Sequence, residues 1–222
     1  MSNRSETGRA SRLSAFDDLI NFLVDLQATY NPPVDNLKID HLRQVHERAS
    51  QAHQVVSVSD AAYRVALNKR NETVKPLNGV VRSVVNLVMA LGLANGQTPK
   101  VKSLAKAITG NVKLSQQSIE ARMDHFNQFI VLIASLDGYT SDREMLEIAS
   151  LQSLHQVMKE TNKELAKKES VLTSARLQRD VTFKGEDGLL QNTRRVKLYL
   201  RSLLGDRSEA YRQVIRITQV IK

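Results

Sequence analysis

The sequence predicts an all-α protein made of two tandem copies of one helical unit. No stretch shows the alternation of apolar and polar residues that is typical of a strand. Long segments instead place apolar residues at alternating intervals of three and four, and this pattern occurs twice, 109 residues apart. The repeated positions are Leu37, Ile39, Leu42, His46, Ala66 and Arg70 in the first copy and Leu146, Ile148, Leu151, His155, Ala175 and Arg179 in the second.

The first twelve residues contain three arginines and no apolar core, so they resemble neither a secretion signal nor a membrane anchor. We expect residues 1–12 to form a disordered basic arm. Residues 13–110 are then the first helical repeat and residues 111–222 the second.

Each copy is expected to begin with a short amphipathic helix, because apolar residues recur there at helical spacing. The best match of the two sets pairs Phe16 with Met123, and the loop that follows each helix would absorb the small shift in register. Loop residues follow in both copies, at 31–33 and 140–142. The apolar sets are Phe16, Leu19, Phe22, Leu23 and Leu26, and Met123, Phe126, Phe129, Ile130 and Ile133.

A longer helix of about 35 residues is expected next in each copy, because a seam of apolar or small residues follows heptad spacing. Residues 57–60 resemble a loop in the first copy, but the matching residues 166–169 are good helix formers, which favours one continuous helix in both. The seams are Leu42, Val45, Ala49, Ala52, Val56, Ser59, Tyr63 and Ala66, and Leu151, Leu154, Met158, Thr161, Leu165, Lys168, Leu172 and Ala175.

Pro76 in one copy and the stretch from Gly185 to Gly188 in the other predict breaks before a third helix. In the first copy this helix is apolar on nearly every side, so it is buried either between the copies or in a contact between molecules. A homo-oligomer formed through it is therefore one prediction. A short fourth helix is expected around 100–108 and 209–217, and the whole should pack as an antiparallel bundle. The apolar positions of the third helix that predict this homo-oligomer are Val80, Val84, Leu87, Val88 and Leu91.

Twenty positions carry a resemblance to known sequences. They are Asn36, Leu37, Lys38, Ile39, Leu42, His46, Pro76, Leu77, Gly188, Leu189, Val196, Lys197, Tyr199, Arg201, Ser202, Gly205, Ser208, Tyr211, Gln213 and Val214. On these residues the chain resembles a family of duplicated, basic, all-helical uncharacterised proteins from Bacteroidota. The resemblance covers most of residues 13–214 and implies the same duplicated helical fold, without implying any activity or site residue. The stretch between the copies, Gly110 to Ser118, is short for that family.

The amino-acid composition excludes several classes of site and of protein. The chain has no cysteine, which excludes disulfides and thiolate metal sites and fits a reducing compartment. Its most apolar stretch, from Val80 to Ala94, contains Arg82 and is shorter than the roughly 20 residues of a membrane span. We therefore expect a cytoplasmic protein with no membrane partner.

No motif predicts catalysis or a bound cofactor. Gly-rich phosphate loops are absent, and His41, His46 and His53 lack the spacing and the companion ligands of a zinc site. His46 and His155 are more simply half-buried polar residues of a packed helix. Paired carboxylates such as Glu186 and Asp187 fall at expected helix starts, where they complement the helix dipole. We expect no metal, no cofactor and no enzyme activity.

The basic surplus is the one feature with functional content. The net charge is +9, and residues 190–222 alone contain eight basic and two acidic residues. Guanidinium groups suit phosphate, which predicts a binding or scaffolding protein for an acidic partner, most simply nucleic acid without sequence specificity. The alternative is a structural or protein-interaction bundle with no nucleic-acid role. The candidate residues are Arg194, Arg195, Lys197, Arg201, Arg207, Arg212 and Arg216.

Overall fold

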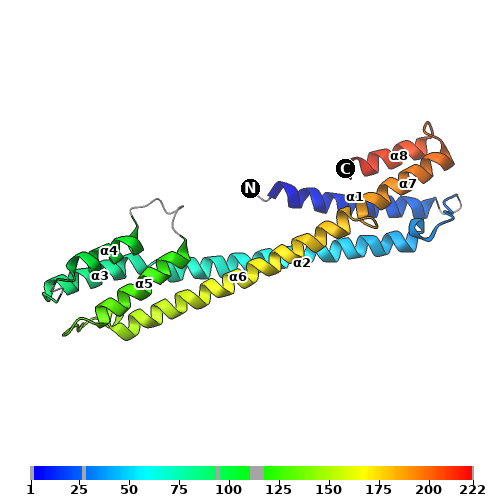
Figure 1. The fold of residues 1–222 in the computed structure, drawn as a ribbon. Helices are drawn as coiled ribbons and strands as arrows, with labels where there is room; N and C mark the ends of the chain where they lie inside the picture. Colours follow the sequence, from blue (N-terminus) through cyan, green and yellow to red (C-terminus); the bar gives the residue numbers. More distant parts are fainter. Residues whose placement is uncertain (1–2, 27–28, 94–95, 111–117, 222) are drawn as a thin grey trace. The chain divides into compact units, whose positions relative to one another are not determined.

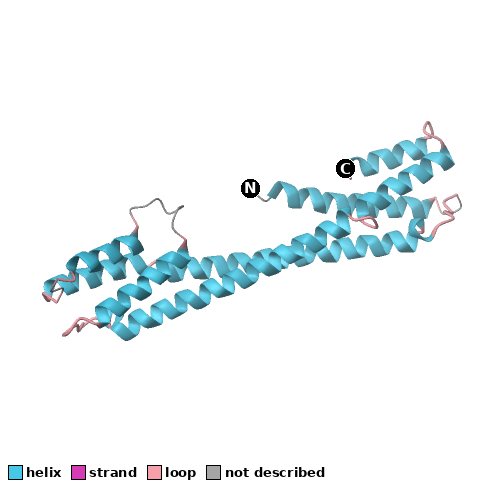
Figure 2. Cartoon of the chain, viewed as in Figure 1, coloured by secondary structure: helices cyan, strands magenta, loops and turns pink. Residues whose placement is uncertain are grey.

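The structure, a computed structural model, describes residues 3–26, 29–93, 96–110 and 118–221, with the backbone alone at residues 3–7. Within these ranges the regular elements are all helices, which confirms the all-α prediction (Figures 1 and 2). The elements are α1 (Asn3–Asp25), η1 (Asp35–Leu37), α2 (Ile39–Val74), α3 (Leu77–Ala90), α4 (Thr98–Thr109), α5 (Ile119–Ala134), η2 (Glu144–Leu146), α6 (Ile148–Lys184), α7 (Leu189–Leu204), α8 (Glu209–Ile217) and η3 (Thr218–Val220), where η marks a 3-10 helix.

The two long helices confirm the heptad pattern. α2 has 36 residues and α6 has 37, and both continue through the segments that the first copy left ambiguous. Every predicted seam position is buried or half-buried, whereas Val58 and Val65, which lie off the seam, are more than half exposed. The predicted breaks are also present, because α3 begins directly after Pro76 and α6 ends at Lys184.

The chain folds into two compact units whose bounds differ from those of the two expected repeats. Unit 1 comprises Met1–Ala61 and Ser170–Lys222, and unit 2 comprises Ala62–Glu169. Unit 1 therefore joins the first helix of the first expected repeat to the last two helices of the second. Unit 2 joins the third and fourth helices of the first repeat to the first helix of the second.

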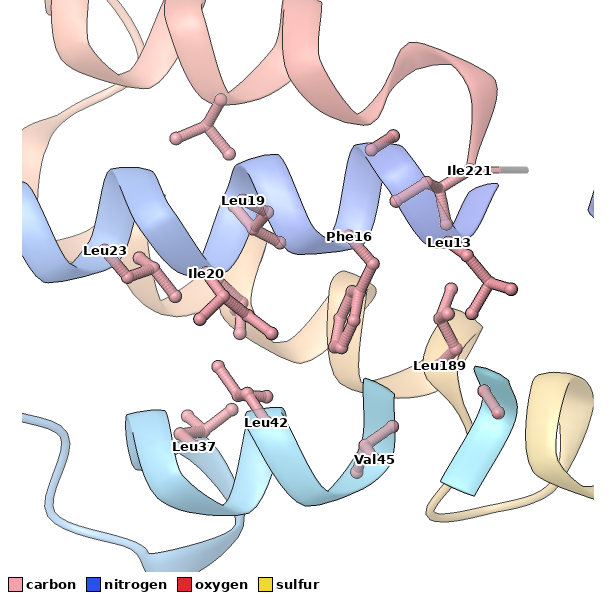
Figure 3. Packing of buried hydrophobic residues seen from close by; sticks show 14 of the residues in the cluster. Leu13, Phe16, Leu19, Ile20, Leu23, Leu37, Leu42, Val45, Leu189 and Ile221 are labelled. Carbon is pink, nitrogen blue, oxygen red and sulfur yellow. The ribbon is translucent and has the colours of Figure 1, made fainter. Parts of the chain in front are cut away.

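The core of unit 1 forms around α1. Figure 3 shows Phe16 and Ile20 pointing from α1 toward α2, where Leu42 and Val45 point back, while Leu189 approaches from α7. Phe16 and Leu19 are fully buried. Complete burial of large side chains such as these stabilises the unit by about 1.5–3 kcal/mol each.

Helix α1 starts earlier than the sequence indicates. It begins at Asn3, so residues 3–12 of the expected disordered arm are helical. Arg9 Nη2 donates a hydrogen bond to Asp180 Oδ1 at 3.1 Å, and Arg12 Nε donates to the Val220 carbonyl at 3.4 Å. Both partners lie far along the chain, so the composition of the arm gave no indication of them.

Unit 2 buries α3. Leu77, Val80, Val81, Val84 and Val88 lie in a core that also contains side chains from α4, α5 and α6. Of the apolar positions that predicted self-association, only Leu91 is exposed, and Leu87 is half-buried. Burial within the chain therefore accounts for most of this apolar surface, and self-association stays a prediction.

Ring contacts of the first helix in each expected repeat favour a register that differs from the sequence match. Phe16 lies against the His46 ring, with centroids 6.4 Å apart, and Phe126 lies against His155 at 6.2 Å. These contacts favour a match of Phe16 with Phe126, whereas the sequence match pairs Phe16 with Met123. The sequence match counted every apolar residue and included Phe22 and Leu26, which are only half-buried and do not mark the core stripe.

Candidate functional site

The seven predicted cations lie along one helical hairpin of unit 1. Helix α7 carries the first four, the turn after it carries Arg207, and α8 carries the last two. The turn begins at Gly205, whose φ of 77° lies in the left-handed region that favours glycine. Helix α8 then begins at Ser208, whose hydroxyl accepts a hydrogen bond from the Tyr211 amide.

Three of the α7 cations share one side of the helix. Successive residues are about 100° apart around a helix axis, which places Arg194, Lys197 and Arg201 within about 60° of one another. The buried stripe of α7, which includes Val196 and Leu200, occupies a different sector. We call these three residues the α7 basic flank. Arg195 projects about 100° away from Arg194 and does not belong to it.

Electrostatics are unfavourable within the flank. Burial lowers the pKa of Lys197, and the positive charge of Arg194 one turn earlier lowers it further. Arg194 is exposed and Lys197 is half-buried. Neither side chain has a hydrogen bond or an ion pair with another described residue. An anion bound here would relieve this repulsion.

Three of the seven predicted cations, Arg201 of the flank and both arginines of α8, are partly compensated. Arg201 Nη2 lies 3.7 Å from Asp206 Oδ2, and Glu209 lies 3.8 Å from Arg212 and 3.4 Å from Arg216. The sequence surplus of the C-terminal tail therefore overstates the charge that α8 offers to a partner.

A polar cluster around Asp187 was missed by the sequence reasoning, which interpreted this residue as a dipole partner at a helix start. Its Oδ1 lies 2.9 Å from His41 Nε2 and accepts from Asn192 Nδ2 at 3.2 Å. Its Oδ2 accepts from Arg48 Nη2 at 2.8 Å. His41 and Arg48 are seven residues apart on α2, so their shared face was the one signal in the sequence.

The turn that carries Asp187 depends on a close backbone approach. A Cβ atom at Gly188 would lie 2.9 Å from both the Gly185 nitrogen and the Phe183 carbonyl carbon, so a larger residue does not fit. The Gly188 amide donates to the Gly185 carbonyl at 2.9 Å. This turn holds Asp187 beside a small cavity of about 200 Å³ lined by Val45, Arg48 and Thr182 among others.

The Asp187 carboxylate stays ionised. Burial alone would raise its pKa, but hydrogen bonds from Arg48, Asn192 and His41 outweigh this and lower the pKa to about 2. A carboxylate with so low a pKa is a poor general base at neutral pH. The cluster therefore joins α2 to the α6–α7 turn and contributes to stability.

The histidines considered as metal ligands differ in their contacts. His41 contacts Asp187, whereas His46 and His155 pack against phenylalanine rings and are half-buried. Burial lowers the pKa of His155, as does Lys159, while Asp124 opposes the shift. Among the described residues no group of three or more His, Asp or Glu side chains could hold a metal ion.

Comparison of the chain with protein families, curated proteins and solved structures found no match. The resemblance to the Bacteroidota family stays a prediction. No helix in the described part of the chain is long and apolar enough to cross a membrane.

Proposed function

We propose that this chain is a non-catalytic scaffold that binds an acidic partner through the α7 basic flank, most simply the phosphates of nucleic acid without sequence specificity. The proposal includes a cytoplasmic location, which fits the absence of cysteine. The scaffold itself is proposed to be an internally duplicated, antiparallel helical bundle.

Matching local structures support the duplication. The Tyr30 hydroxyl donates to the Leu37 carbonyl at 2.6 Å, and the Tyr139 hydroxyl donates to the Leu146 carbonyl at 2.7 Å. The buried positions of α3 and α7 also follow the same intervals. They are Leu77, Val80, Val81, Val84 and Val88 in α3, and Leu189, Asn192, Thr193, Val196 and Leu200 in α7.

Ion pairs support the antiparallel arrangement of the long helices. In unit 1, Arg176 of α6 lies 3.1 Å from Asp60 of α2. Earlier on α2 in the same unit, Arg48 lies 2.8 Å from Asp187, just beyond the end of α6. Positions later in α2 therefore pair with positions earlier in α6, as antiparallel helices require.

One observation carries the proposed binding role: Arg194 and Lys197 are neighbours of like charge, and neither has an acidic partner among the described residues. Holding like charges together costs free energy, and a bound phosphate offsets that cost. Arginine also binds phosphate in bidentate fashion, as it does carboxylate.

The triple variant Arg194→Ala, Lys197→Ala, Arg201→Ala tests the proposal. We expect its affinity for a labelled oligonucleotide to fall and its salt dependence to flatten, because fewer phosphates are neutralised. The matched control replaces three exposed lysines of α6, Lys159, Lys163 and Lys167, with alanine. These lysines lie next to Glu160 and Glu164 in the sequence. It removes the same charge, so equal affinities of the two variants would refute the proposal.

A second candidate function is a purely structural or protein-interaction bundle. The carboxylates beside Arg201, Arg212 and Arg216 favour it, since paired charges serve solubility better than phosphate binding. It predicts that the wild-type protein does not bind oligonucleotides even at low salt.

A further inference from the structure

A second basic surface without a described acidic neighbour lies in unit 2. Residues 73–119 contain no Asp or Glu at all, the longest such stretch in the sequence. Lys102 and Lys106 of α4 and Arg82 of α3 are the cations within it that line one groove. We call this the α3–α4 groove.

The groove is shallow and open, and its lining is both polar and apolar. Its volume is about 300 Å³. The half-buried side chains of Val85 and Ala105 contribute apolar surface, and the exposed amide of Asn86 contributes hydrogen-bonding capacity. None of its described lining residues is acidic, in contrast to α8, where Glu209 lies beside two arginines.

The three cations are available to a ligand. Arg82, Lys102 and Lys106 are all exposed, and none of their side chains forms a hydrogen bond or ion pair with another described residue. Lys102 and Lys106 are four residues apart, which separates them by about one helical turn, or about 6 Å along the axis. Two cations at this spacing, opposite a third, suit successive charges along a chain better than a single small anion.

We propose that the α3–α4 groove binds the phosphate backbone of a nucleic-acid strand. The charges are complementary, and the apolar lining accepts the uncharged faces of sugars and bases. By the shared burial pattern, Arg82 holds the position on α3 that Arg194 holds on α7.

This site does not rest on the α7 basic flank, and the experiment separates the two. A labelled single-stranded oligonucleotide is titrated with three proteins. They are the wild type, a triple variant that combines Arg82→Ala, Lys102→Ala and Lys106→Ala, which we call the groove variant, and the control variant at Lys159, Lys163 and Lys167. We expect the groove variant to bind about tenfold more weakly or worse and the control to bind nearly as wild type does. Equal affinity of the groove variant and the control would overturn the proposal, whatever the α7 variant does.

A second measurement needs no variant. The oligonucleotide is expected to protect Lys102 and Lys106 of the wild-type protein from acetylation, read by mass spectrometry, and to leave Lys163 unprotected. Unchanged modification of both groove lysines would overturn the proposal. So would a groove variant that loses binding to phosphatidylglycerol vesicles and keeps its affinity for the oligonucleotide.

Discussion

Asp187 shows how one side chain can join segments that are far apart in the sequence. Its carboxylate accepts from Arg48 and Asn192 and contacts His41, and these donors lower its pKa from the ordinary 3.8 to about 2. The folded state thus holds the ionised form more strongly than the unfolded chain does. This stability is present above pH 3.8 and is lost as the pH falls toward about 2.

We therefore expect Asp187→Asn to unfold more easily at neutral pH, by about 1 kcal/mol, because the ion pairs are partly exposed. The variant should also lose part of the acid sensitivity between pH 3.8 and about 2. Urea unfolding at several pH values measures both effects. Asp206→Asn, which changes a more exposed carboxylate 3.7 Å from Arg201, is the control. Identical pH profiles for Asp187→Asn and wild type would contradict the assignment.

The two tyrosine hydrogen bonds provide a matched pair of predictions. Tyr30 is 5% exposed, and its hydroxyl is the donor to the Leu37 carbonyl. Burial, and secondarily Tyr199, raises the pKa of Tyr30. Tyr30→Phe should cost about 1–3 kcal/mol because it leaves a buried carbonyl unsatisfied. Tyr139→Phe should cost less, because Tyr139 is only half-buried. Thermal unfolding of both variants checks this order, and the reverse order would refute it.

At the scale of elements, the seam of the long helices makes the clearest prediction. Leu42 is fully buried at the start of α2, whereas Val58 is 63% exposed in the same helix. Leu42→Ala should lower the free energy of unfolding by about 2–5 kcal/mol, because it removes contacts and leaves a cavity. Val58→Ala should change it by less than about 0.5 kcal/mol. Denaturant unfolding distinguishes the two, and similar losses would contradict the seam.

Helical periodicity made much of this element structure predictable. The seams and the breaks at Pro76 and Gly185 depend on local sequence, and local sequence was sufficient to place them. The early start of α1 was not predictable in this way, because Arg9 and Arg12 form contacts with residues near the other end of the chain. The register of Phe16 with Phe126, which the ring contacts favour, required knowledge of which apolar residues are buried.

At the scale of the whole molecule, the composition of the units was also beyond local sequence. A repeat is a segment of chain, whereas a compact unit is defined by contacts, and each unit here takes helices from both expected repeats. The candidate site shows the same limit. Counting charges found the arginines of α7 and α8, but it could not show that Glu209 lies beside Arg212 and Arg216 or that Arg82, Lys102 and Lys106 line one groove.

The salt dependence of oligonucleotide binding by the wild-type protein tests the central claim most directly. Each neutralised phosphate contributes about −0.9 to the log–log slope on duplex DNA, so binding of a duplex oligonucleotide to Arg194 and Lys197, the two flank cations without an acidic partner among the described residues, predicts a slope of about −1.8. Engagement of the α3–α4 groove as well makes the slope steeper. A slope near zero, or no binding at low salt, would contradict the claim that this helical scaffold binds phosphate.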